Sequence, residues 1–429
     1  MSALPAPKVL PLRAFEGYGI EIEYMVVHSD SLSVFPIVDQ LVRSGAEQEN
    51  SLRGLGWSNE LVSHVIELKN VFPTASLRSL RDQLQHEIRM MNRRLSTAGG
   101  CLMPTAMHPW MDSLKETKLW AHGEAEIYNA YDRIFNCRSH GWANLQSLHI
   151  NLPFENDEAF ARLHAAVRLV LPILPAIAAS SPIADGVPTG YMDYRLETYR
   201  HNAVSIPSIT GKVIPETVST KKEYESLILA PMYQEIAPFD PDRLLQYEWL
   251  NSRGAIARFD RNAIEIRLVD VQECPYADIA IAGVVIDLIK MLYAEYRVPL
   301  GVQQSIKTDA LANILLASVR EGDNAIIDDP DYLAIFGYRG NRCRAAALWK
   351  HITQDLITTV DHSAIWHESL STILRHGPLA RRILQAVASE CTSAQLHAVY
   401  RTLCKCLEEG RMFVPEKSSA LMTEAQSEL

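Results

Sequence analysis

Gly19-Ile20-Glu21-Ile22-Glu23-Tyr24 is the stretch that decides the fold. Apolar and acidic residues alternate in it, and successive side chains of a β-strand point to opposite faces. A strand here has one apolar face and one face that carries Glu21 and Glu23, about 7 Å apart along the strand. Two carboxylates at this spacing repel each other unless water or a cation screens them. The pair therefore predicts either a solvated sheet face or one wall of a metal site.

Three later segments, 65–69, 148–152 and 264–268, repeat the alternation. Their polar faces pair glutamate with lysine, histidine with asparagine, and glutamate with arginine. Alternation of this kind is typical of antiparallel sheets that lay one face on a core. We therefore expect an α+β fold, in which a mostly antiparallel β-sheet with a polar active-site face is backed by helices. Strands are expected at 18–27, 63–70, 102–107, 255–259 and 263–270, and around His149.

Helical periodicity dominates the rest of the chain. An apolar stripe from Leu77 to Leu95 predicts a core-facing helix, and 160–179 predicts an apolar helix bent at its prolines. Further helices are expected at 278–296, 311–321, 342–357, 370–388 and 393–408. Segments 28–56 and 181–220 are interpreted as loops, the second rich in Pro, Gly, Ser and Thr, and 414–429 as a frayed tail. Two parts follow: a sheet-bearing domain over 13–300, and a helical C-terminal region over 301–429 packed on it.

Composition excludes several classes of protein. The chain has 429 residues, with 48% hydrophobic and 21% charged, which is typical of a globular protein. The net charge of −10 argues against nucleic acid as a partner. Seven scattered cysteines do not suggest a disulfide framework. The sequence shows neither a secretory signal nor an apolar run long enough for a bilayer, so a cytoplasmic protein without a membrane partner is expected.

The polar faces supply candidate ligands for a hard cation. Carboxylate oxygens are the ligands that Mg²⁺ prefers, and His149 on the same face is a further candidate. For any one strand a solvated face is the better interpretation, and its recurrence on four strands weakens that interpretation without removing it. Arg267, Arg195 and Lys69 are candidate cations for phosphate, with a cross-strand ion ladder as the alternative. The sequence has no phosphate-loop motif, so an ATP-using protein of this kind would bind ATP through its sheet, metal ions and arginines.

Taken in order, these segments resemble the glutamate–cysteine ligase type 2 family, also called carboxylate–amine ligases. Residues 19–23 resemble its opening Gly-x-Glu-x-Glu strand, and 60–67 its second acidic strand. His108-Pro109 is similar to the end of its Gly-Thr-His-Pro-Phe segment, and 146–150 to its Gln-His-Val-His-Val strand. Ser180-Ser181-Pro182, Thr189-Gly190 and Arg195 follow in the family's order. Residues 264–270 closely match its Val-Glu-Ile-Arg-x-x-Asp strand.

The resemblance implies a glutamine-synthetase-like catalytic sheet over 13–300 that uses ATP and two or more Mg²⁺ ions, with manganese as an alternative. Such enzymes activate the glutamate γ-carboxylate as an acyl phosphate, which an amine, most simply cysteine, attacks to form an amide. Arg267 and Arg195 would be catalytic, and with Lys69 would bind ATP. His108 and Trp110 would contact substrate, and segment 181–220 could close over the site. The implied metal ligands are Glu21, Glu23, Glu60, Glu67, His149 and Glu265.

Three departures from the family pattern leave questions open. Ser147 stands where the family has its first histidine, Ala106-Met107 replaces Gly-Thr, and Trp110 replaces phenylalanine. The amine acceptor is therefore open, although the partners remain a small-molecule amino acid and an amine. Two alternatives stay: phosphoryl transfer to a guanidino or amine group on the same fold, and an inactive nucleotide-binding descendant. The sequence does not fix the oligomeric state, for which a homo-oligomer is one outcome.

Overall fold

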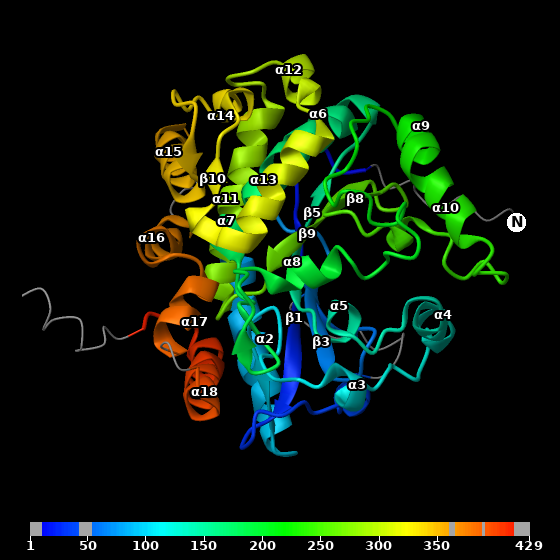
Figure 1. The fold of residues 1–429 in the computed structure, drawn as a ribbon, viewed down its shortest axis with the longest axis vertical. Helices are drawn as coiled ribbons and strands as arrows, with labels where there is room; N and C mark the ends of the chain where they lie inside the picture. Colours follow the sequence, from blue (N-terminus) through cyan, green and yellow to red (C-terminus); the bar gives the residue numbers. More distant parts are fainter. Residues whose placement is uncertain (1–10, 43–53, 360–364, 388–390, 416–429) are drawn as a thin grey trace, which may run out of the picture.

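A seven-stranded sheet forms the centre of the molecule (Figure 1). The structure is a computed structural model that describes residues 11–42, 54–359, 365–387 and 391–415. The strand order is β2-β3-β1-β5-β9-β8, and β4 also pairs with the end of β1, every pairing being antiparallel. The strands are β1 (Gly19–His28), β2 (Leu55–Asn59), β3 (Val65–Asn70), β4 (Gly100–Met103), β5 (Ser147–Pro153), β8 (Ala255–Arg258) and β9 (Ala263–Asp270).

The four alternating segments of the sequence become four adjacent strands, β3, β1, β5 and β9. Glu21 lies opposite Lys69 on one side and His149 on the other, and Glu23 lies opposite Glu67. A register shift on β5 follows Leu148. This register places the polar residues of all four strands on one face, so the predicted antiparallel sheet with a polar face is confirmed.

The opposite face of the sheet is apolar and forms the core. It packs on α2 (Leu77–Ser96), α6 (Asp157–Val170) and α11 (Pro275–Tyr293). Almost every residue of α11 is buried, which explains why its sequence is apolar all round rather than amphipathic. The sheet residues in this core are fully buried: Ile20, Ile22, Tyr24, Ile66, Leu68, Leu148, Ile150, Ile264 and Ile266.

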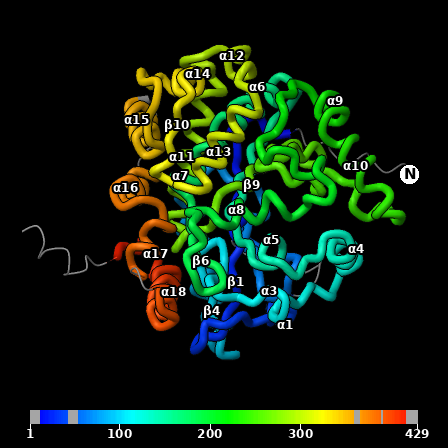
Figure 2. Tube along the Cα trace, in the orientation of Figure 1, coloured from blue at the N-terminus to red at the C-terminus, as the bar shows by residue number. Residues whose placement is uncertain are grey.

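The last third of the chain is helical, as predicted, and runs along one side of the molecule (Figure 2). The predicted helix over 370–388 is two helices, because Gly377 has φ of +85° and Pro378 follows it. Residues of α13 and α15 share one core with the sheet and α6. The predicted tail over 414–429 lies outside the described residues from 416 onward. The main helices here are α13 (Thr308–Glu321), α15 (Ala345–Thr359), α16 (His367–His376), α17 (Leu379–Val387) and α18 (Ser393–Glu409).

Several elements were not predicted. The segment 181–220, interpreted as a loop, contains α8 (Tyr194–Tyr199), whose N-cap Asp193 accepts a hydrogen bond from the Leu196 amide. Strand β2 begins inside the expected loop 28–56, and β4 is shorter than the expected 102–107. No helix in the described ranges combines the length and the hydropathy that a membrane span needs. Also unpredicted are α4 (Ala125–Phe135), α9 (Lys221–Tyr224) and α10 (Ala230–Ile236).

Short elements connect these parts of the chain. They are α1 (Val38–Leu41), α3 (Ser113–Glu116), α5 (His140–Ala143), β6 (Ile183–Ala184), β7 (Val187–Pro188), α7 (Pro175–Ala178), α12 (Leu300–Ser305), β10 (Ile326–Ile327), α14 (Pro330–Ile335) and β11 (Cys343–Arg344). Of these, α5 borders the site described next, because Gly141 and Trp142 line one of its cavities.

Candidate active site

The polar face of the sheet forms the floor of a cavity of about 1080 Å³, which we call the outer cavity. Its walls come from α4, α10 and the segment 246–249, and α4 and α10 lie on the right of the view in Figure 1. Such a volume is sufficient for a nucleotide-sized ligand. Eight of the predicted site residues line this cavity: Glu21, Glu23, Glu60, Glu67, Lys69, His149, Glu265 and Arg267.

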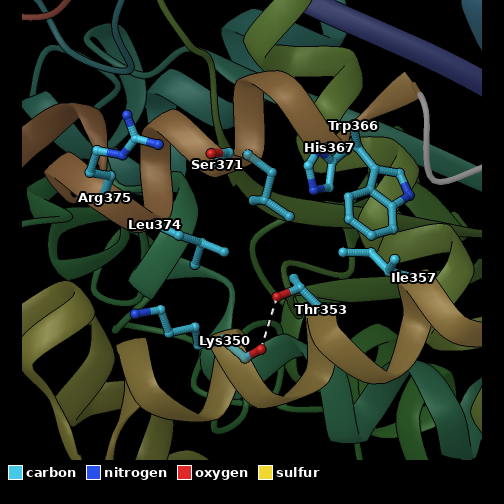
Figure 3. Close-up of a pocket in the computed structure, with 9 residues that line it drawn as sticks. Lys350, Thr353, Ile357, Trp366, His367, Ser371, Leu374 and Arg375 are labelled. Atoms are coloured by element: carbon cyan, nitrogen blue, oxygen red, sulfur yellow. Dashed lines mark hydrogen bonds between the residues drawn. The ribbon is translucent and has the colours of Figure 1, made fainter.

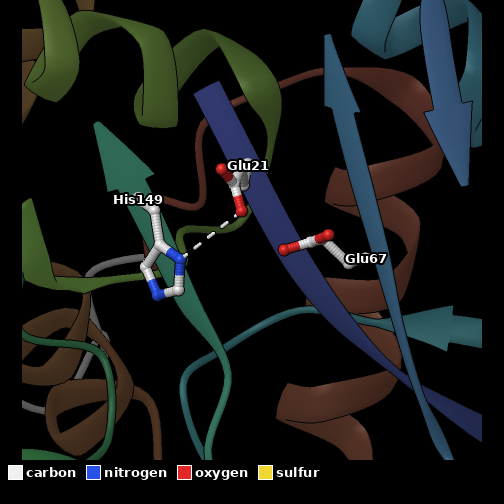
Figure 4. A group of neighbouring side chains, drawn as sticks. All are labelled: Glu21, Glu67 and His149. Carbon is white, nitrogen blue, oxygen red and sulfur yellow. Dashed lines mark ion pairs between the residues drawn. The ribbon is translucent and has the colours of Figure 1, made fainter. Parts of the chain in front are cut away.

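Two groups of three ligand atoms share Glu67. Glu21, Glu67 and His149 bring their ligand atoms within 4.8 Å of one another, and so do Glu23, Glu60 and Glu67. Figure 4 shows the first group, with Glu21 on the central strand between the other two side chains. Opposite ligands of an octahedral Mg²⁺ ion are about 4 Å apart, twice its usual bond length. Both triads therefore fit a divalent cation after small rotamer changes, with Glu67 as a shared ligand.

Neighbouring side chains fix the orientation of these carboxylates. Glu23 accepts hydrogen bonds from the Ser147 amide at 2.7 Å and the Ser147 hydroxyl at 3.0 Å. Asn151 donates to Glu21 at 2.9 Å, and Ser58 donates to Glu67 at 2.7 Å. Hydrogen bonds of this kind hold the side chains that bind a metal ion in the geometry that the ion needs. Among them, the sequence pattern placed only Asn151 on the polar face.

The carboxylates of the triads repel one another in the absence of an ion. Burial and the charge of Glu21 raise the pKa of Glu67 to about 7. Burial, and then the charges of Glu67 and Glu23, raise the pKa of Glu60 well above its usual value. Burial alone would raise the pKa of Glu21, but its contact with His149 outweighs this and lowers it. A divalent cation would remove this repulsion, so the residues present fit a metal.

His149 lies at the meeting point of three carboxylates. Its Nδ1 is 3.8 Å from Glu21 and 3.7 Å from Glu265, and its Nε2 is 3.9 Å from Glu23. Burial would lower the pKa of His149, but its contact with Glu21 and the charges of Glu23 and Glu265 raise it. The Ser147 hydroxyl lies 2.8 Å from Nε2. His149 therefore has Nδ1 directed toward the first triad and Nε2 directed toward Ser147.

Cations line the same cavity beside the carboxylates. Glu265 pairs with Arg267 at 3.1 Å and Arg258 at 3.5 Å, so this carboxylate is engaged by arginines and belongs to neither triad. Lys69 pairs with Glu67, whose charge, with that of Glu21, raises the lysine pKa against the effect of burial. Arginines and lysines beside carboxylates can hold phosphate oxygens where a metal ion screens the carboxylates.

Arg195 has a different environment from Arg267. Its side chain is 2% exposed, its Nε is paired with Asp270, and both its terminal nitrogens donate to the backbone carbonyl of Arg267 at 3.4 Å. The guanidinium lines a smaller cavity that adjoins the outer one. Arg195 therefore contacts the backbone of Arg267, and the Arg195 side chain does not line the outer cavity.

His108 and Trp110 do not line either cavity. The His108 ring is buried and donates through Nε2 to the Leu32 carbonyl at 2.7 Å, and burial lowers its pKa to about 4. Trp110 packs on His397 of α18, with ring centroids 4.2 Å apart. The two residues that were predicted to contact substrate therefore lie where the segments after β1 and β4 meet α18. Contacts with residues distant in sequence decide where their side chains point.

The smaller cavity, which we call the inner cavity, has a volume of about 250 Å³. It shares Glu23, Glu60, His149 and Arg267 with the outer cavity and extends toward α5 and α8. A third cavity of about 360 Å³ lies between α15 and α16, and none of the predicted site residues lines it (Figure 3). The chemistry-bearing side chains therefore gather around the outer and inner cavities.

Sequence reasoning missed the aromatic walls. Tyr128 and Tyr131 of α4, together with Trp249, line both cavities. Tyr247 stacks on Trp249 with ring centroids 5.6 Å apart at the rim, where a nucleotide base could stack. The amphipathic character of 125–135 was the available signal, although its charged and aromatic residues are too mixed to reveal which face meets the sheet.

The sequence matches glutamate–cysteine ligase family 2 over residues 18–400. The chain belongs to this family. The match includes both triads, the cations beside them and most of the C-terminal helices. Membership of glutamate–cysteine ligase family 2 identifies the chain as a carboxylate–amine ligase, with small-molecule substrates.

The chain is also similar to individual proteins. An uncharacterized protein of Archaeoglobus fulgidus is 37% identical over 269 residues, which are 62% of this chain and 72% of that protein. A Rhodopirellula baltica protein named "Putative glutamate--cysteine ligase 2" is 28% identical over 198 residues, or 42% of this chain and 47% of that protein's length. A bifunctional glutathione synthetase from Pasteurella multocida has the same fold, with a TM-score of 0.55 at 12% identity, over 92% of this chain and 52% of that one.

Proposed function

We propose that the chain is an ATP- and magnesium-dependent ligase that joins the γ-carboxylate of glutamate to an amine, most simply cysteine, through an acyl phosphate. The observation that carries the proposal is the pair of triads sharing Glu67, which line one cavity together with Arg258 and Arg267. Family membership and the name of the Rhodopirellula baltica relative support the choice of substrates.

Two displacements make up the proposed reaction. A γ-carboxylate oxygen of glutamate attacks the terminal phosphorus of ATP, the bond from that phosphorus to the bridging oxygen breaks, and ADP leaves with the electron pair. The amine nitrogen then attacks the acyl carbon, the carbon–oxygen bond to the phosphoryl group breaks, and phosphate leaves. One proton passes from the nitrogen to solvent, so ATP, acid and amine give ADP, phosphate and amide.

The chain's residues position these groups and stabilise charge. Glu21 and His149, with the shared Glu67, would hold one magnesium ion, and Glu23 and Glu60, with Glu67, a second. Bound magnesium would neutralise charge on the phosphates during transfer. Lys69, Arg258 and Arg267 would contact phosphate oxygens in the same cavity. Arg195 would hold Arg267 in place through its carbonyl. Catalysis would then rest on positioning and electrostatics, without a protein nucleophile.

ADP release under defined substrates tests the proposal. We expect release only when ATP, Mg²⁺, glutamate and an amine are all present, with a product mass equal to acid plus amine minus water. ADP formed at the same rate without acid or amine would contradict it. A stable phosphorylated amine or guanidino compound, with no amide, would instead assign phosphoryl transfer to the fold.

A further inference from the structure

A cavity on the helical side of the molecule takes no part in the proposed chemistry. It has a volume of about 360 Å³ and lies between α15 and α16 (Figure 3). Its apolar lining consists of Ile357, Trp366, Leu370 and Leu374. The indole nitrogen of Trp366 donates to Asp287 at 2.8 Å, so the tryptophan offers only apolar surface to a ligand. One part of this cavity therefore suits an apolar group.

Among the described residues, the lining of this cavity includes basic side chains and no acidic one. Lys350 of α15 and Arg375 of α16 line it, and so does His367. Both Lys350 and Arg375 are exposed, and neither pairs with a carboxylate in the described part of the chain. The acidic residue of α15, Asp355, pairs instead with Arg297 at 2.5 Å. The lysine and the arginine are therefore available to a ligand.

Charged and apolar side chains lie at different ends of this cavity. In Figure 3, Lys350 and Arg375 lie on the left, one on each helix, whereas Trp366 and Ile357 lie on the right. Leu374 lies between the two ends. A ligand that spans the cavity would therefore place a charged head near the lysine and the arginine, and an apolar body near the tryptophan.

The charge of this cavity contrasts with that of the whole chain. The chain has a net charge of −10, yet no carboxylate of the described residues lines the cavity beside its two cations. An anion would be attracted to them, and an ammonium group would be repelled. Because both cations are exposed, a charged head alone would bind weakly. An apolar body adds affinity when it leaves water for the apolar lining, so the cavity favours a ligand that has both parts.

We propose that the cavity between α15 and α16 binds a small amphipathic anion, in which one carboxylate is joined to a short aliphatic or aromatic body. Lys350 and Arg375 would contact the carboxylate, and Leu370, Leu374 and Trp366 would contact the body. A volume of about 360 Å³ lies within the roughly 300–1,000 Å³ of small-molecule sites. The cavity shares no lining residue with the outer or the inner cavity, so the proposal does not depend on the reaction that the chain catalyses.

The anion 4-phenylbutyrate and the cation 4-phenylbutylamine test the charge selectivity, because they have similar apolar bodies and opposite charges. Calorimetric titration of the full chain at low ionic strength measures the binding of each without turnover. We expect 4-phenylbutyrate to bind with a Kd about tenfold or more below that of the amine. Absence of 4-phenylbutyrate binding, or equal or tighter binding of the amine, would overturn the inference.

The double substitution of Lys350→Gln with Arg375→Gln tests the location. Both side chains are exposed, so the melting temperature should stay that of the parent. The affinity for 4-phenylbutyrate should fall by about tenfold or more, since hydrogen bonds from two charged groups are lost. The matched control, Arg342→Gln with Lys405→Gln, removes the same charge from exposed positions outside the cavity and should bind as the parent does. An unchanged affinity in the first variant, or an equal loss in both, would place the anion elsewhere.

Acetate and Leu374→Asn test the apolar body. Acetate has the same head without the body, so the parent should bind it about tenfold or more weakly than 4-phenylbutyrate. Leu374 is only partly buried, and Leu374→Asn should weaken 4-phenylbutyrate binding several-fold at an unchanged melting temperature. An acetate affinity equal to that of 4-phenylbutyrate, or an unchanged 4-phenylbutyrate affinity in Leu374→Asn, would contradict the apolar part of the site.

Discussion

Glu23 and Glu67 lie directly opposite each other on adjacent antiparallel strands, with carboxylate oxygens within 4.8 Å. Like charges in this cross-strand position destabilise a sheet. Both residues are more than nine-tenths buried, so bulk water screens them little. The pair is therefore stable only with protons or cations nearby, and a divalent cation is the partner that the surrounding geometry favours.

Metal binding should depend on Glu67. We expect millimolar Mg²⁺ or Mn²⁺ to raise the melting temperature. The corresponding gain in unfolding free energy is about 2.7 kcal/mol when the ion is at 100 times its Kd. Glu67→Gln should abolish this rise, because the residue belongs to both triads. The variant should also be at least as stable as the parent without metal, since repulsion has been removed. Thermal melts with and without EDTA measure both effects.

The control for this experiment is Glu126→Gln. Glu126 is exposed on α4, the helix that forms part of the cavity wall. It should keep the full metal-induced shift. If Glu67→Gln keeps the shift as well, neither triad holds an ion.

Ser147 should act as a positioning residue for Glu23 and His149. Its hydroxyl contacts both side chains, so Ser147→Ala leaves Glu23 with the backbone hydrogen bond only. Loss of such a partner typically costs about 10- to 100-fold in metal affinity. We expect a higher Mg²⁺ concentration for half-maximal ADP release, with an unchanged melting temperature in EDTA. An unaltered Mg²⁺ dependence would show that the serine does not orient the ligands.

Arg195 and Arg267 should respond differently to substitution. Arg195→Met leaves Asp270 buried without its cation, and breaking a buried pair costs about 3–5 kcal/mol of unfolding free energy. Arg267→Lys, in the cavity wall, should mainly lower kcat. Urea unfolding and ADP release, measured on both variants, separate the two roles. A stable Arg195→Met variant that has lost activity would assign Arg195 a direct catalytic role.

Acid sensitivity should come in part from His164. Its ring is buried against Phe160 and has no hydrogen-bond partner in the described structure. Burial, and then the charge of Arg168, lowers its pKa to about 3. Between that value and about 6.5 the unfolded chain binds a proton that the folded chain does not. The unfolding free energy must therefore fall as the pH falls through this window.

His164→Leu removes this contribution. The gain in unfolding free energy over the parent should be about 2 kcal/mol larger at about pH 5 than at about pH 7.5. Urea unfolding at the two pH values measures it. An equal gain at both would mean that His164 does not titrate on unfolding in this range.

The parts of the fold that the sequence predicts are those governed by local periodicity. Alternation identified the strands that carry Glu21, Glu67, His149 and Glu265, and the apolar stripe identified α2. Which strands pair with each other depends on contacts between distant segments. The sequence nevertheless suggested that these strands are neighbours, because each has one polar face and one apolar face that must cover a core. The apolar helix α11 was visible from composition alone.

Features set by contacts between distant segments were not predictable. His108 bonds Leu32 and Trp110 packs on α18, and neither partner is near in sequence. Tyr199 reaches the inner cavity only because α8 forms inside a segment whose composition indicates a loop. The charge of Arg195 made it a candidate for the site, whereas its pairing with Asp270 depends on tertiary packing, which the sequence does not show.

The most direct test of the central claim follows an oxygen atom. Glutamate carrying oxygen-18 in its γ-carboxylate should transfer one labelled oxygen to inorganic phosphate when ATP, Mg²⁺ and an amine are present, since the carbon–oxygen bond breaks in the second displacement. Labelled phosphate together with the amide is the expected result. Unlabelled phosphate, or a phosphorylated amine without amide, would contradict an acyl-phosphate ligase.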